Sequence, residues 1–225
     1  MVGSGHRELN ECMAEICHTS PVHPLQSLPD LSVADLLALP AAASLSLVTS
    51  LDGQICGPDG SARTISGPED LRLLRLLRAA SDVIVVSART AAREQYPALH
   101  THAEFTQQRL SAGLPRDPHV VVITRTGDVS ACRPEFLAAA NTTVMTTDDY
   151  PAALATIRSH FGQRVLAEVG GTIIGNHPGV HERIWLSLSP TLVGDQGHAL
   201  SISLDGYRCR TRYVGRQFVL QRFER

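Results

Sequence analysis

The sequence predicts an α/β domain with a mixed, mainly parallel sheet, helices on both faces of the sheet, and an antiparallel hairpin at the C-terminal end. Three observations support this fold class. β-Prone runs alternate with helical patterns between residues 44 and 176, as in βαβ units. The runs at 83–87 and 119–124 are almost continuously apolar, which is typical of strands buried on both faces. From residue 183 onward, closely spaced β-segments around Gly215-Arg216 indicate a hairpin.

Length and composition favour one large domain. The chain has 225 residues, of which 43% are hydrophobic and 19% charged, enough to bury a full core. Its formal net charge of −2 argues against non-specific binding to nucleic acid or anionic membranes, which need a positive field. No apolar run approaches the roughly 18 residues that span a bilayer, and the N-terminus lacks a secretory pattern. We therefore expect a cytoplasmic protein.

All twenty basic residues are arginine. The absence of lysine excludes Schiff-base enzymes and lysine-dependent phosphate loops. The arginine fork suits phosphate recognition, although an all-arginine surface is equally expected from a genome rich in G and C.

The five cysteines form no evenly and closely spaced framework, so we expect reduced thiols; they occupy positions 12, 17, 56, 132 and 209. The group His6, Cys12, Cys17, His18 and His23 has zinc-ligand residue types, but it lacks a paired knuckle. We therefore predict no metal site.

The N-terminal part is predicted to differ from the rest of the chain. We interpret residues 1–31 as an extension, partly disordered, with one periodic piece at 8–17. The domain is expected to cover 32–225. Ser32 is a typical N-cap for a short helix that Pro40 stops.

The first core strand starts at Ser44 and leads to Asp52-Gly53. The turn formers of 57–60 then indicate a flexible excursion that would serve as a lid. Ser66 and Glu69 have the spacing of a capping box for the next helix. The other predicted elements are strands at 83–87, 119–124, 142–146, 164–168, 184–188, 210–214 and 217–223, and helical segments at 90–94, 150–161 and 170–176.

Two residues along this order have the chemistry of a site. Asp52 follows a strand, where its carboxylate would reach a cleft, although Asp-Gly pairs also make ordinary β-turns. Arg78 ends the helix that carries Arg72 and Arg75 at three-residue spacing. A solvated cationic face near the helix C-terminus explains Arg72 and Arg75, while Arg78 lies at the end of the helix that leads into the next buried strand at 83–87.

The order of strand, acid, loop, helix, arginine and strand from Ser44 to Glu94 resembles the reductase family of riboflavin biosynthesis. Members share the dihydrofolate-reductase-like fold and are often fused to a deaminase. The resemblance continues at 164–175, which contains Glu168-Val169-Gly170-Gly171, and at 186–194. The H-x-E and P-C-x-x-C elements of a zinc deaminase are missing. No G-x-G-x-x-G follows a strand, which argues against an ordinary Rossmann domain.

The resemblance implies NADPH-dependent reduction of 5-amino-6-(5-phosphoribosylamino)uracil to its ribitylamino product by a homodimer, with neither nucleic acid nor membrane as a partner. It implies Asp52 and Glu168 as catalytic residues, and Ser61 and Arg78 as residues that bind the phosphorylated pyrimidine. The residues that it implies for cofactor binding are Val48, Ser87, Thr90, Glu94, Thr124, Arg125, Gly170, Gly171 and Thr172.

Three positions depart from the family pattern. Thr64 replaces a frequent aromatic residue, Arg89 stands where relatives carry glycine, and Val169 replaces the first expected glycine. A β-branched residue forced to positive φ would be strained. Two alternatives therefore stay open: a reductase of another heterocycle, such as a pterin or dihydrofolate, that does not need Arg78 for a phosphate, and a catalytically silent paralogue that binds a nucleotide or a partner.

Overall fold

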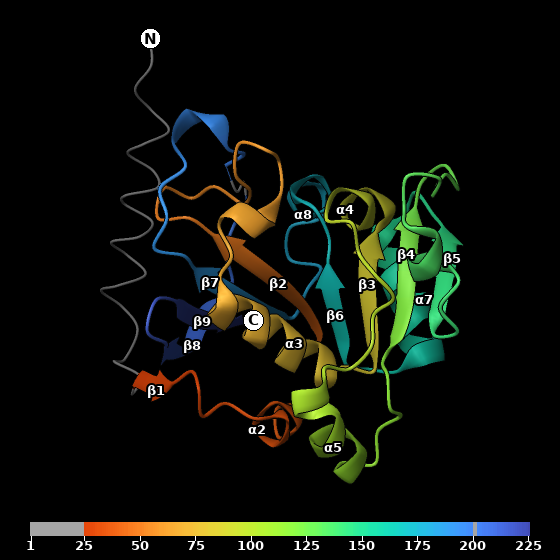
Figure 1. Cartoon of the computed structure of the whole chain (residues 1–225), viewed down its shortest axis with the longest axis horizontal. Coiled ribbons are helices and arrows are strands. Elements are labelled where there is room, and N and C mark those ends of the chain that lie inside the picture. The colour runs from red at the N-terminus through yellow and green to blue at the C-terminus, as the bar shows by residue number, and fades with distance from the viewer. Residues whose placement is uncertain (1–24, 200–201) are drawn as a thin grey trace.

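The computed structural model describes residues 25–199 and 202–225 (Figure 1). The periodic piece predicted at 8–17 and the cysteines at positions 12 and 17 lie outside these residues. In the part of the chain that is described, no helix combines the length and the apolar character needed to cross a bilayer.

One sheet organises the described chain, with strand order β1-β8-β9-β7-β2-β6-β3-β4-β5. The central strands are parallel, whereas β9 runs antiparallel to both β7 and β8. The predicted mixed sheet and C-terminal hairpin are thus confirmed. The strands are β1 (Leu25–Ser27), β2 (Ala43–Thr49), β3 (Val83–Ser87), β4 (His119–Thr124), β5 (Thr142–Thr146), β6 (Val165–Glu168), β7 (Arg183–Leu188), β8 (Arg208–Val214) and β9 (Val219–Glu224).

Helices cover both faces of this sheet (Figure 1). One face packs α7 and α8 against inward side chains such as Val85 and Ala167. The other packs α2, α3 and α5 against Leu166 and Trp185, with α4 and α6 further along. The helices are α2 (Val33–Leu37), α3 (Pro68–Ala79), α4 (Ala88–Arg93), α5 (Ala103–Ser111), α6 (Pro134–Leu137), α7 (Tyr150–Phe161) and α8 (Gly171–Asn176), with short 3-10 turns η1 (Ala62–Thr64) and η2 (Gly194–Gln196).

The N-terminal boundary of the domain differs from the prediction. Residues 25–31, which we expected in the extension, belong to the packed domain. β1 pairs in parallel with β8, and Leu28 and Leu31 are buried in the same cluster as α3. The sequence interpretation missed this strand because it is only three residues long and its partner lies far along the chain.

The start of α3 also differs from the predicted capping box. The N-cap is Gly67, and the Ser66 hydroxyl donates to Asp70 Oδ2 at 2.6 Å. The Glu69 carboxylate accepts from the backbone N–H groups of 216–218, at 2.7 to 3.1 Å. Those groups lie in the turn of the β8–β9 hairpin, so Glu69 links the hairpin to α3. The Glu69 carboxylate thus binds a partner far along the chain instead of the N-cap backbone that a capping box requires.

Two elements lie on the periphery of the sheet. β5, predicted as a strand at 142–146, is the edge strand, and Val144 is 41% exposed. Helix α5 was not predicted. It is anchored by Arg109, whose fully buried guanidinium donates to the carbonyls of Ala79, Ser81 and Pro115.

Candidate functional site

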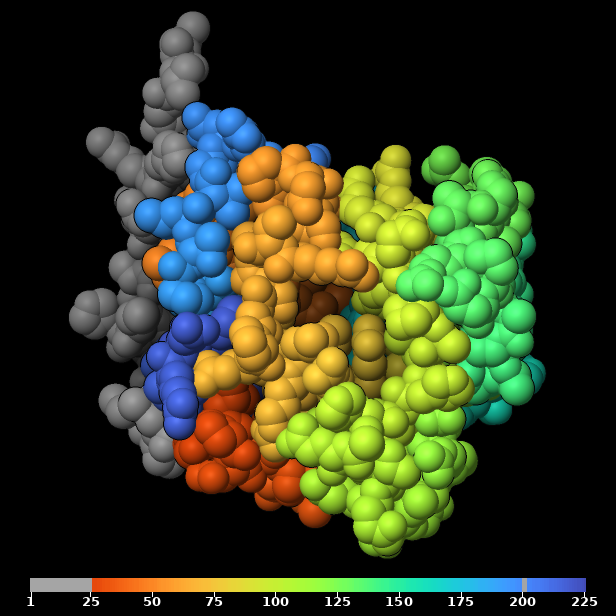
Figure 2. Space-filling model, in the orientation of Figure 1, coloured from red at the N-terminus to blue at the C-terminus, as the bar shows by residue number. Residues whose placement is uncertain are grey.

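A cleft of about 1340 Å³ opens at the carboxyl ends of β2, β3, β4 and β6. Figure 2 shows it as a hollow beside α3, with residues of β2 at its floor. Parallel α/β sheets bind their ligands at this end of the strands. A site for one small molecule usually has a volume of roughly 300 to 1,000 Å³. The cleft is larger than that, so it has room for two ligands side by side.

Most of the residues predicted for the site do meet in this cleft. Of the thirteen, only Asp52 and Ser61 are outside its lining. The eleven that line it are Val48, Arg78, Ser87, Thr90, Glu94, Thr124, Arg125, Glu168, Gly170, Gly171 and Thr172.

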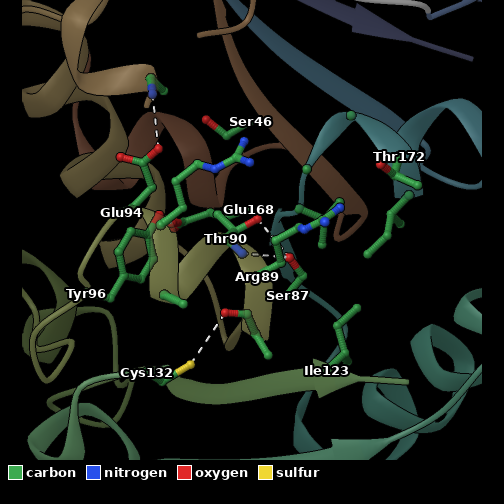
Figure 3. Close-up of a pocket in the computed structure, with 18 of the residues that line it drawn as sticks. Ser46, Ser87, Arg89, Thr90, Glu94, Tyr96, Ile123, Cys132, Glu168 and Thr172 are labelled. Atoms are coloured by element: carbon green, nitrogen blue, oxygen red, sulfur yellow. Dashed lines mark hydrogen bonds between the residues drawn. The ribbon is translucent and has the colours of Figure 1, made fainter. Parts of the chain in front are cut away.

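Three side chains that line the cleft, those of Arg78, Tyr96 and Glu168, contact one another. Figure 3 labels Tyr96 and Glu168 among the lining residues. The Arg78 guanidinium donates Nε to Glu168 Oε1 at 2.7 Å and Nη2 to Oε2 at 2.6 Å. The Tyr96 hydroxyl also donates to Oε2, at 2.6 Å, and its ring lies beneath the guanidinium. Both carboxylate oxygens of Glu168 are therefore satisfied by neighbours from two other elements.

Burial and the paired charges determine how these groups titrate. Burial alone would lower the pKa of Arg78, but the Glu168 carboxylate raises it above its ordinary value. Burial raises the pKa of Tyr96 well above 10, and the charge of Glu168 raises it further. Arg78 thus stays charged and Tyr96 stays protonated at physiological pH.

This pairing changes the expected role of Arg78. Two donors on one edge of its guanidinium, which we expected to fork onto a phosphate, are held by Glu168. Nη1 has no protein partner among the described residues and remains for a ligand. Tyr96 was missed, because the sequence indicated only a loop around Tyr96-Pro97.

The backbone of two neighbouring strand ends forms the next part of the cleft wall. Ser87 caps α4 by accepting from the Thr90 N–H at 3.0 Å. A Cβ added to Gly170 would lie 3.5 Å from Thr90 Oγ1, so α4 and α8 meet here, as Figure 1 shows. A Cβ on Gly171 would come within 2.9 Å of Ile55 Cδ1. We call this backbone the glycine strip: it lines the cleft and lies close to Thr90 and Ile55.

The strain considered for Val169 does not arise. Val169 is buried, and its φ is not positive, since Gln95 is the one non-glycine residue of the described chain with positive φ. Arg89 is exposed at the rim of the cleft, in the view of Figure 3 beside Ser87.

Four arginines line the cleft without a carboxylate within 4.0 Å in the described chain: Arg75, Arg89, Arg93 and Arg125. Arg125 follows β4, whose last residue, Thr124, donates its hydroxyl to the carbonyl of Asp128. We attributed Arg75 to a solvated face along with Arg72. Arg72 does pair with Glu104 at 2.7 Å outside the cleft, whereas Arg75 lines it. This surplus of cations favours anionic ligands.

Asp52 lies outside the cleft and is exposed. Its carboxylate accepts from the Ser50 hydroxyl at 2.5 Å and from the backbone N–H groups of Gly194 and Val193 at 2.6 and 3.2 Å. These hydrogen bonds, that of Ser50 first, lower the pKa of Asp52 to about 2. With Gly53 at φ 78°, the Asp-Gly pair makes the β-turn that was its simpler interpretation.

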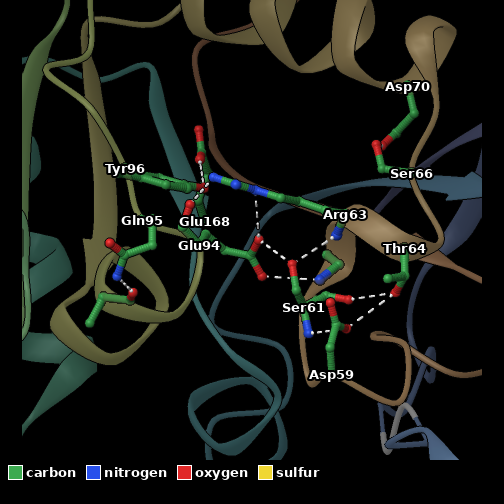
Figure 4. A network of polar contacts seen from close by, with 12 residues as sticks. Asp59, Ser61, Arg63, Thr64, Ser66, Asp70, Glu94, Gln95, Tyr96 and Glu168 are labelled. Atoms are coloured by element: carbon green, nitrogen blue, oxygen red, sulfur yellow. Dashed lines mark hydrogen bonds and ion pairs between the residues drawn. The ribbon is translucent and has the colours of Figure 1, made fainter.

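Ser61 belongs to a network that fixes the loop before α3 (Figure 4). Its buried hydroxyl donates to Glu94 Oε2 at 2.7 Å, and the backbone N–H of Ala62 donates to Glu94 Oε1 at 3.0 Å. The Arg63 guanidinium donates to the carbonyl of Glu94. The excursion at 57–60, interpreted as a lid, is therefore tied at its end to α4.

Comparison with known proteins gives this architecture a family. Residues 43–216 match the family model described as the RibD C-terminal domain. A search of curated proteins found no match. A pyrimidine reductase-like protein from Corynebacterium diphtheriae has a similar structure, with 16% identity, a TM-score of 0.67, and coverage of 86% of this chain and 98% of that one.

Two further solved structures are similar. One is a diaminohydroxyphosphoribosylaminopyrimidine deaminase/5-amino-6-(5-phosphoribosylamino)uracil reductase from Thermotoga maritima, with 16% identity, a TM-score of 0.64, and coverage of 81% of this chain and 56% of that one. The other is dihydrofolate reductase from Enterococcus faecalis complexed with NADP(H) and RAB-propyl, with 9% identity, a TM-score of 0.52, and coverage of 82% and 96%. The chain belongs to the RibD C-terminal domain family, reductases of riboflavin biosynthesis with a dihydrofolate-reductase-like fold.

Proposed function

We propose that the protein reduces 5-amino-6-(5-phosphoribosylamino)uracil to its ribitylamino product with NADPH as the reductant. The observation that carries this proposal is the cleft, which is large enough for two ligands and brings together the glycine strip, the unpaired arginines and the group of Arg78, Tyr96 and Glu168. The family supports the reaction class. The similar reductase from Thermotoga maritima is named for this substrate, and the similar dihydrofolate reductase is a complex with NADP(H).

The residues present fit a dinucleotide. Gly170 and Gly171 line the cleft without side chains of their own, so a dinucleotide would approach the backbone at the start of α8. Arg125, exposed at the end of β4, would pair with a 2′-phosphate, and Arg89 at the rim would reach a second phosphate. NADPH would supply a hydride equivalent from its nicotinamide ring. The chain's own residues hold the dinucleotide against the strand ends and keep its position fixed.

In the proposed reaction, the ring-opened sugar presents an imine-like carbon that accepts the hydride. The π electrons of the C=N bond move to the attached nitrogen, which takes a proton from solvent. Near-attack geometry requires the two carbons to lie roughly 3 to 3.5 Å apart. Arg78 orients the sugar phosphate through its free Nη1, and Glu168 holds Arg78 in place. We assign Asp52 a positioning role in the turn after β2, since a carboxyl with a pKa of about 2 is a poor proton donor at neutral pH.

The family resemblance also supports two proposals, on the oligomeric state and on the location in the cell. We propose a homodimer, which light scattering of the eluted protein would measure directly. The cytoplasmic location stays a prediction.

A titration of the protein fluorescence with NADPH tests the cofactor, and NADPH oxidation at 340 nm with the proposed substrate tests the reaction. We expect saturable binding at submillimolar NADPH, and we expect Arg125→Ala to weaken NADPH binding about tenfold while leaving NADH binding unchanged. Arg116→Ala, outside the cleft lining, is the matched control. No saturable binding overturns the proposal. Oxidation of NADPH with dihydrofolate and not with the pyrimidine would support the other heterocycle reductase.

A further inference from the structure

We propose that Asp70 binds the pyrimidine ring of the substrate by accepting hydrogen bonds from its N–H groups. This inference rests on the proposed function and specifies how the base is recognised. Asp70 lies in the first turn of α3 and lines the same cleft as Arg78.

The position of Asp70 follows from helical geometry. Asp70, Leu74 and Arg78 are four residues apart, so they follow one face of α3, and all three line the cleft. Arg78 comes eight positions after Asp70, which corresponds to about 12 Å along the helix axis. A sugar with its phosphate at Arg78 would therefore place an attached base toward Asp70.

The carboxylate of Asp70 has no cationic partner in the described chain, although the cleft carries several unpaired arginines. The Ser66 hydroxyl donates to Oδ2 at 2.6 Å. Figure 4 shows Asp70 and Ser66 apart from the network of Ser61, Arg63 and Glu94. Burial raises the pKa of Asp70, and hydrogen bonds from Ser66 and Ser187 offset only part of this effect. Asp70 is half-buried, and a partly desolvated carboxylate with so few donors is stabilised by a ligand that supplies more.

The surroundings of Asp70 suit a flat heterocycle. Leu71 and Leu74 lie on the same helix, and Leu47 and Val48 of β2 share the cleft lining. An apolar wall with one carboxylate matches a ring whose faces are apolar and whose edge carries adjacent N–H groups. Two parallel N–H donors on one carboxylate give both affinity and orientation. The arginines elsewhere in the cleft match the sugar phosphate instead.

Two probes separate the ring from the sugar phosphate: 5,6-diaminouracil, which has only the ring, and ribose 5-phosphate, which has only the sugar phosphate. We expect calorimetry to show that Asp70→Asn weakens the binding of 5,6-diaminouracil by about 10- to 100-fold, because an acceptor bonded to N–H groups becomes a competing donor. The affinity for ribose 5-phosphate should stay unchanged. Asp30→Asn removes the same charge from an exposed residue outside the cleft and should change neither affinity.

Ser66→Ala keeps the carboxylate but removes the hydroxyl that donates to it. If Asp70→Asn does not fold, Ser66→Ala still tests the inference, because it should lower the affinity for 5,6-diaminouracil and leave the affinity for ribose 5-phosphate unchanged. Equal affinity of wild type and Asp70→Asn for 5,6-diaminouracil overturns the inference, as does a wild-type protein that does not bind this ring. NADPH titration of the same samples tests the proposed function independently. Loss of ring binding in Asp70→Asn would support the inference even if NADPH does not bind.

Discussion

Replacing Glu168 by Gln should destabilise the fold, because it leaves the charge of Arg78 in a buried place without its partner. The two side chains are only 15% and 5% exposed. Removing one member of such a pair costs about 3 to 5 kcal/mol. Gln keeps the shape and one acceptor oxygen, so we expect a loss near 3 kcal/mol. Tyr96→Phe removes a single hydrogen bond to the carboxylate and should cost about 2 kcal/mol.

Urea denaturation, followed by the fluorescence of Trp185, measures these losses as free energies of unfolding. Trp185 is buried beneath α3 in the same face of the sheet, so its emission reports on the domain that contains the pair. Glu135→Gln is the matched control, since Glu135 pairs with Arg133 where both side chains are 40 to 50% exposed. We expect the control to lose less than about 1 kcal/mol.

A double-mutant cycle isolates the interaction from the separate effects of each residue. Arg78→Met should destabilise on its own, and the double variant Arg78→Met with Glu168→Gln should be less destabilised than the sum of the single variants. A loss in Glu168→Gln no larger than that of Glu135→Gln would refute the reasoning. It would mean that solvent screens the pair in the open cleft and that Glu168 is free to meet a ligand directly.

Two other predictions concern residues outside the cleft centre. Burial, followed by the charge of His177, lowers the pKa of His181 from 6.5 to about 4. As the pH falls, His181 is therefore protonated in the unfolded chain before it is protonated in the folded chain. About 3 kcal/mol of stability present above pH 6.5 should be lost as the pH falls to 4, and urea unfolding of wild type and His181→Gln at both pH values measures it. Asp52→Asn should change NADPH affinity by less than about twofold while exposing the Val193-Gly194 loop to proteolysis; a tenfold loss of affinity would place Asp52 in the cofactor site.

Local patterns in the sequence were sufficient for the elements whose stability is local. The apolar runs of β3 and β4, the N-cap at Ser32 and the hairpin at Gly215 all appear in the structure where the sequence indicates them. Each depends on residues within one element or one turn. The capping box at Ser66 was wrong because its acid is used by the hairpin turn, and short-range spacing carries no information about such a partner.

The sequence predicted which residues lie in the cleft better than it predicted which side chains they contact. The strand ends that carry Ser87, Thr124 and Gly170 were recognisable, because a buried strand followed by a small or hydroxyl residue is a local signal. Tyr96 had no such signal, since it follows α4 in a loop and meets Glu168 only through the packing of β3 beside β6.

Strand order explains both the pairing of Glu168 and the position of Asp52. The chain passes from β2 through α3 to β3, but these two strands are not neighbours in the sheet, because β6 lies between them. The last residue of β6 is Glu168, in register with Val86 of β3. It therefore lies at the centre of the carboxyl edge, near Arg78 at the end of α3. Asp52 follows β2 on the side of β7, and its carboxylate meets the loop after β7. An acid at the end of the inserted strand, and not the acid after the first strand, is the one that this topology delivers to the cleft.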